Sequence, residues 1–236
     1  MKITLTIISS LILTFLSACS TITEEAGFKE VEEFYGGSVF LKKGANVSTI
    51  ATGPQGSYLE VDLNTPGISK YYRDLQVPAS NCAYLVYKHL RPKQRTDYDY
   101  FKVTIQDSAT SHTYTFSPAD LELATQSIDS LNTLMFRLQA ADFSTIVNKL
   151  NPAALGTMSH DSVVANLRKI SQQLAPFNSY MLQGFEVQKV LLAGQSVPIV
   201  RFALSVSRVQ KTTVPLLVFL NPAPHTTQFL CGLRIP

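Results

Sequence analysis

The sequence predicts an α+β protein, with helices packed on a curled antiparallel sheet in the C-terminal half and a smaller α+β module before it. Three observations support this fold class. Residues 118–138 carry apolar side chains at helical spacing, whereas residues 179–236 contain four strand-like runs. Residues 36–63 and 101–116 alternate apolar and polar side chains, as strands with one covered face do. A composition of 45% hydrophobic and 16% charged residues is sufficient to build a core.

The first residues are typical of an export signal. One charge, Lys2, precedes an uncharged run over residues 3–16, which is shorter than the roughly 20 residues that span a bilayer. Leu16-Ser17-Ala18-Cys19 then resembles the lipobox of bacterial lipoproteins, in which an aliphatic residue and two small ones precede a cysteine. The resemblance implies that residues 1–18 are a cleaved signal peptide and that Cys19 carries acyl chains, palmitate among them. The alternative is an ordinary signal peptide cut near Ala18, which would leave Cys19 as a thiol.

A lipidated Cys19 places the protein on a membrane, because two or three acyl chains anchor a protein stably where one does not. Ser20 follows the cysteine, whereas enterobacterial lipoproteins retained in the inner membrane have Asp there. We therefore expect the outer membrane, facing the periplasm, if the source has one. Residues 19–27 are polar and are expected to form a short tether.

Residues 28–117 are expected to form the N-terminal module. Two or three strands are predicted within residues 36–63, and a helical region follows from Pro66 to Leu90, interrupted near Val77-Pro78, with Ser80 as the cap of its second piece. Residues 101–116 are predicted to be a hairpin.

Residues 118–236 are expected to form the C-terminal domain. Ser117-Pro118 marks the start of the long helix, and Ser159 the start of a later helix whose inner face holds Val163, Leu167, Ile170 and Leu174. A short helix is predicted between them, near residues 142–151, and four antiparallel strands after them.

This order of helices and strands, and the stretch "LGTMSHDSVVANLRKISQQLAPF" at residues 155–177, resembles the nuclear-transport-factor-like and cystatin-like α+β superfamily, which recurs in bacterial lipoproteins. The resemblance covers roughly residues 118–236 and implies a cone-shaped domain. Members of the group include enzymes, ligand-binding pockets and interaction modules, so the resemblance does not choose among these functions.

The motifs of common enzymes are missing. The sequence has no Gly-x-Ser-x-Gly and no glycine-rich nucleotide loop, and its four histidines have no second ligand close by in sequence. Ser159-His160-Asp161 is better explained as a helix cap than as a catalytic group. We therefore predict no catalytic, cofactor-binding or metal site. The net charge of +3 is too small to favour nucleic acid as a partner.

Three further features leave alternatives open. The basic run at residues 88–95 could contact anionic headgroups, although solvated cations at a helix C-terminus explain it as well. Six tyrosines between residues 71 and 100 could line a binding surface or pack. Cys82 and Cys231 could form a disulfide in an oxidising compartment, or remain two buried thiols.

Two function classes follow from these observations. The first is a lipid-anchored cell-envelope protein that acts as a non-catalytic binding or assembly module, with the membrane and an envelope protein as partners. The alternative is an envelope enzyme, such as a hydrolase, with an unrecognised site inside the cone. A pocket lined by ionisable groups with perturbed pKa values would favour the enzyme. An exposed apolar patch would favour the binding module.

Overall fold

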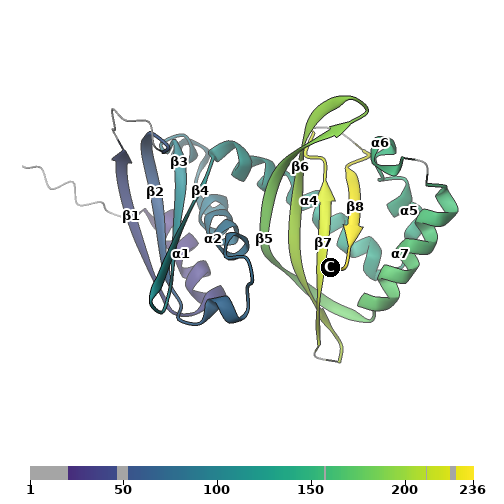
Figure 1. The fold of residues 1–236 in the computed structure, drawn as a ribbon, viewed down its shortest axis with the longest axis horizontal. Coiled ribbons are helices and arrows are strands. Elements are labelled where there is room, and N and C mark those ends of the chain that lie inside the picture. Colours follow the sequence, from purple (N-terminus) through teal and green to yellow (C-terminus); the bar gives the residue numbers. More distant parts are fainter. Residues whose placement is uncertain (1–20, 47–52, 157, 211, 224–226) are drawn as a thin grey trace, which may run out of the picture.

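The computed structural model describes residues 21–46, 53–156, 158–210, 212–223 and 227–236 (Figure 1). This part of the chain is a mixed α+β protein with two open four-stranded sheets. Cys19 and the predicted signal peptide lie outside the described residues.

The first sheet has the strand order β1-β2-β3-β4. The bounds of its strands are β1 Ser38–Asn46, β2 Gly56–Asn64, β3 Tyr100–Asp107 and β4 Thr110–Phe116. β1 and β2 are antiparallel, as are β3 and β4, so the strands predicted within residues 36–63 and the hairpin at 101–116 are confirmed. β2 and β3 are parallel, which requires a crossover, and helix α2 provides it.

Residues 22–27, predicted to belong to a polar tether, are helical instead. α1 spans Ile22–Tyr35 and packs against α2. Its first turn is closed by a capping box, in which the Thr21 hydroxyl accepts from the Glu24 backbone N–H and the Glu24 carboxylate accepts from the Thr21 N–H. Glu24 is almost fully buried, because Lys43 and Tyr98 cover its carboxylate. Residues 21–27 of the expected tether are therefore part of the folded body.

α2 spans Gln76–His89 and lies between the two sheets (Figure 1). The interruption predicted near Val77-Pro78 is absent, because Pro78 occupies the first turn, where its missing N–H costs nothing. Ser80 is accordingly inside the helix rather than at its cap. The predicted start at Pro66 is only a 3-10 turn, Ile68–Lys70, and a short helix α3, Pro92–Arg95, follows α2.

The second sheet has the order β5-β6-β7-β8, with all neighbours antiparallel. The bounds of its strands are β5 Phe177–Leu192, β6 Gln195–Arg208, β7 Thr213–Leu220 and β8 Leu230–Arg234. Its helices are α4 Pro118–Gln139, α5 Phe143–Val147, α6 Pro152–Leu155 and α7 His160–Leu174. The long helix, the short helix, the Ser159-capped helix and the four strands predicted for this half are confirmed.

The two sheets are joined through α2, which contacts β3 and β4 on one side and β5 on the other. β5 has a bulge at Leu182/Gly184, and the Phe185 backbone N–H next to it donates to the Ser80 hydroxyl at 2.8 Å. Residues 78–87 of α2 are all buried as a result. The boundary expected between residues 117 and 118 falls at the start of α4, and the division into two domains stays a prediction.

Candidate functional site

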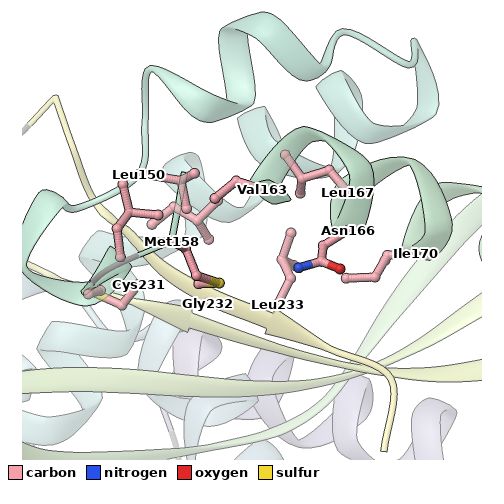
Figure 2. A pocket seen from close by; sticks show the side chains of 12 residues that line it. Leu150, Met158, Val163, Asn166, Leu167, Ile170, Cys231, Gly232 and Leu233 are labelled. Carbon is pink, nitrogen blue, oxygen red and sulfur yellow. The ribbon is translucent and has the colours of Figure 1, made fainter. Parts of the chain in front are cut away.

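An apolar cavity of about 140 Å³ lies between α7 and the edge strand β8. We call it the α7–β8 groove. Its residues come from α7, β8 and the segment from Leu150 to Met158, and they are mostly aliphatic: Leu150, Ala154, Leu155, Met158, Val163, Asn166, Leu167, Ile170, Leu230, Cys231, Gly232 and Leu233. Figure 2 shows the α7 side chains on one side of the groove and those of β8 on the other.

The inner face of α7 forms one wall of the groove. Ser159 caps the helix by accepting from the Ser162 N–H, and the helical period then directs Val163, Leu167 and Ile170 to one side. Val163 and Leu167 are buried, whereas Ile170 is half-buried and Met158 is exposed at the entrance. The buried stripe predicted for this helix is confirmed, and the groove lies where that stripe is incompletely covered.

The other wall is β8, the last strand of its sheet. The start of β8 is held by residues 149–151, which lie between α5 and α6. The Asn151 N–H donates to the Leu230 carbonyl at 2.7 Å, and the Leu230 N–H donates to the Lys149 carbonyl at 2.8 Å. Cys231 is the extra residue of a bulge in the pairing with β7. Beyond Leu230, β8 pairs with β7 alone among the described residues, so its other edge is unpaired there.

The chemistry of the α7–β8 groove suits apolar contact. Asn166 and Cys231 are the polar side chains among its described residues. Burial raises the pKa of the Cys231 thiol to about 11, so the thiol stays protonated and weakly nucleophilic at neutral pH. An apolar cavity of this size favours an apolar occupant over water, which would find few hydrogen-bond partners there.

A second cavity, of about 360 Å³, lies where α1, α2, α4 and β5 meet. Glu30, Tyr84 and Lys88 line it, together with Asn132 and Tyr180. Burial opposes ionisation of Glu30, but hydrogen bonds from Lys88 and His89, both at 2.6 Å, outweigh it and lower the pKa of that carboxyl. Burial raises the pKa of Tyr84 to about 12. Both shifts move away from neutral pH, so neither group is suited to proton transfer.

The two cysteines that sequence reasoning left open for pairing are free thiols in the structure. Cys82 is fully buried in α2, which packs on β5, while Cys231 is in β8 at the opposite edge of the sheet. Strands are about 4.8 Å apart and the Cα atoms of a disulfide at most about 7 Å, so three strand spacings cannot be bridged.

Ser159-His160-Asp161 acts as a helix start. The Ser159 hydroxyl caps α7, and both His160 and Asp161 extend into solvent. The interpretation of this cluster as a cap is therefore confirmed, and the structure brings no nucleophile and base together here.

Most of the side chains of the basic run and most of the tyrosines make contacts within the fold. Lys88 and His89 contact Glu30, and Arg95 pairs with Glu122 at 2.9 Å while it stacks over Tyr87. Burial and the bond to Glu122 raise the pKa of Tyr87 to about 12. The remaining tyrosines of this region are mostly buried or half-buried, except Tyr71, which is exposed.

Across the described ranges of the chain, the His, Cys, Asp and Glu side chains form no group of three that could hold a metal ion. None of the helices described is long and apolar enough to span a membrane. Comparison with protein families, curated proteins and solved structures finds no match to this chain.

Sequence reasoning missed the α7–β8 groove, although it placed both of its walls. Val163, Leu167 and Ile170 were predicted on the inner face of the helix, but their partner Leu233 is more than sixty residues away in the chain. One signal for the groove is a difference in extent between its two walls. The apolar stripe on α7 is wide, and the five residues of β8 are too few to cover it.

Proposed function

We propose that this chain is a lipid-anchored protein of the bacterial cell envelope and that it acts as a non-catalytic binding or assembly module. The lipobox-like Leu16-Ser17-Ala18-Cys19 supports the anchor, with the outer membrane, facing the periplasm, as the site if the source has one. The α7–β8 groove is the observation that carries the binding role.

The fold supports this proposal at a finer level. Helices α4 to α7 lie beside one antiparallel sheet, β5 to β8, as expected for a cystatin-like cone. We propose that residues 118–236 are such a cone and that the groove is its open side. A partner would insert an apolar side chain or segment between α7 and β8, while the edge of β8 offers backbone groups to an extended segment.

The alternative, an envelope enzyme, has less support. Such an enzyme needs groups that change protonation near the working pH, and the two cavities described above hold Glu30, Tyr84 and Cys231 in states far from it. The binding module requires no such groups, and it needs an apolar surface that a partner can reach.

The direct test is photo-crosslinking in intact cells from the rim of the α7–β8 groove. A benzophenone amino acid at Met158 is expected to give a discrete crosslinked species, whereas the same group at Leu191, exposed at the end of β5, is expected to give none. The crosslink should also be lost in Cys19→Ser, which removes the anchor.

Two variants of α7 provide the matched control. Asn166 is exposed yet lines the groove, so Asn166→Trp should fill its mouth and abolish the Met158 crosslink. Arg168 is exposed and is not part of the groove, so Arg168→Trp should leave the crosslink unchanged. Equal crosslinking in both variants, or none from Met158, would contradict a binding role for the groove.

A further inference from the structure

The folded body begins two residues after Cys19. Thr21 is already fixed, because its N–H donates to the Glu24 carboxylate at 2.7 Å. Glu24 is held in turn by the Lys43 ammonium and the Tyr98 hydroxyl, both at 2.8 Å. Hydrogen bonds from buried or charged groups of this kind hold a chain firmly, so no flexible tether separates residue 21 from the body.

The turn that contains α3 lies against the same helix start. The Gln94 amide donates to the Thr21 hydroxyl at 2.8 Å and accepts from the Thr23 hydroxyl at 2.9 Å. Arg91 and Lys93, which precede Gln94 in the chain, are exposed, and neither forms an ion pair with a described residue. Ile22, the first residue of α1, is 83% exposed. We call Ile22, Arg91 and Lys93 the anchor-proximal surface.

We propose that the acyl anchor on Cys19 holds the anchor-proximal surface directly on the lipid bilayer, so that Ile22, Arg91 and Lys93 contact the headgroups. The inference rests on the proposed lipidation of Cys19. Two residues span at most about 7 Å. The headgroup layer of one leaflet is about 5 to 7 Å thick, so this spacer is consumed in crossing it.

The anchor, rather than charge, sets this contact. Arg91 and Lys93 are attracted to an anionic leaflet. Glu25, three residues after Ile22, and Asp97, four residues after Lys93, are also exposed and oppose that attraction. Ile22 adds an apolar side chain that can enter the interface beside the acyl chains. Docking is therefore expected to persist at high salt.

The orientation has a consequence for the α7–β8 groove. The first sheet with α1 forms one end of the long axis of the molecule, and α7 with β8 lies toward the other (Figure 1). A body that rests on the membrane through its N-terminal half has the α7–β8 groove in its other half, where a partner in the envelope can reach it.

The chain contains no tryptophan, so single tryptophans report their own positions. The full acylated protein, purified from membranes, would be reconstituted into vesicles of phosphatidylethanolamine and phosphatidylglycerol with brominated acyl chains. Ile22→Trp is expected to lose emission relative to unbrominated vesicles. Leu191→Trp, 74% exposed in the second sheet, is expected to keep its emission. A Gly-Ser spacer inserted after Ser20 should restore the emission of Ile22→Trp.

Equal emission of Ile22→Trp in brominated and unbrominated vesicles, from protein that floats with them, would overturn the docking. Quenching of Leu191→Trp to the same extent would overturn it as well. If the purified protein has no acyl mass on Cys19 and does not float, the proposed anchor itself fails, and flotation and intact mass identify that outcome separately.

Discussion

Replacement of Gly184 by alanine tests the contact that joins the two sheets. A Cβ on Gly184 would lie 2.1 Å from the carbonyl oxygen of Val77 and 2.7 Å from the hydroxyl oxygen of Ser80. Ordinary contact begins at 3.4 Å, so α2 and β5 would have to separate by about 1.3 Å. The obstacle is helix backbone, which cannot rotate away as a side chain can.

The expected loss of stability has two parts. Overpacking of this kind costs about 1 to 3 kcal/mol. Separation would also break the bond from the Phe185 N–H to Ser80, and a buried N–H left without a partner costs about 1 to 3 kcal/mol. We therefore expect Gly184→Ala to lower the free energy of unfolding by about 2 to 6 kcal/mol. Ser80→Ala should show the second part alone.

Urea unfolding followed by circular dichroism measures these differences. Gly232→Ala is the matched control in the same sheet, because its Cβ would meet only Phe219 at an ordinary 3.5 Å, and a change within about 0.5 kcal/mol is expected. A Gly184→Ala protein as stable as the Gly232→Ala protein would refute the close approach of α2 to β5.

Three further predictions concern the carboxylate at the start of α1, the cap of α7 and the thiols. Burial raises the pKa of Glu24, but its bonds to Lys43, Thr21 and Tyr98 outweigh burial and lower it. These bonds therefore stabilise the fold above about pH 4.5, and this stabilisation is lost as the pH falls through the folded-state pKa of Glu24. In Glu24→Gln, the free energy of unfolding should depend less on pH in this acid range. Ser159→Ala should lower the free energy of unfolding by about 1 kcal/mol, measured by heat or urea, whereas His160→Ala should change it by no more than about 0.5 kcal/mol. A larger loss of stability in His160→Ala than in Ser159→Ala would contradict the capping role of Ser159. Mass spectrometry of the non-reduced protein after maleimide treatment should find Cys231 labelled slowly and Cys82 only after unfolding; a Cys82–Cys231 disulfide would refute the separation described here.

The local elements of this chain are readable from its sequence, because each has its own period and cap. Ser117 starts α4 and Ser159 starts α7 as expected, and the strands of the second sheet follow the turns that separate them. The start of α1 differs from the prediction, because polar residues at a chain start favour a tether as much as the first turn of a helix. The pair Thr21 and Glu24, three residues apart, is a capping-box signal that could have revealed it.

The remaining features depend on contacts between distant parts of the chain. The parallel pairing of β2 with β3 and the packing of α2 on β5 each join segments that are far apart in the chain, so no local pattern encodes them. The α7–β8 groove depends in the same way on where a five-residue strand ends against a helix. Pro78 was expected to interrupt the helix, because sequence alone does not show whether a proline falls in the first turn.

The anchor on Cys19 is the central claim, and the mass of the N-terminal peptide tests it most directly. The protein would be purified from membranes of cells that make the full chain and then cleaved with trypsin. If Cys19 is lipidated, the N-terminal tryptic peptide begins at Cys19, ends at Lys29 and carries a diacylglyceryl group and an amide-linked acyl chain. A peptide with an unmodified Cys19 thiol, or one that continues upstream of residue 19, would contradict it.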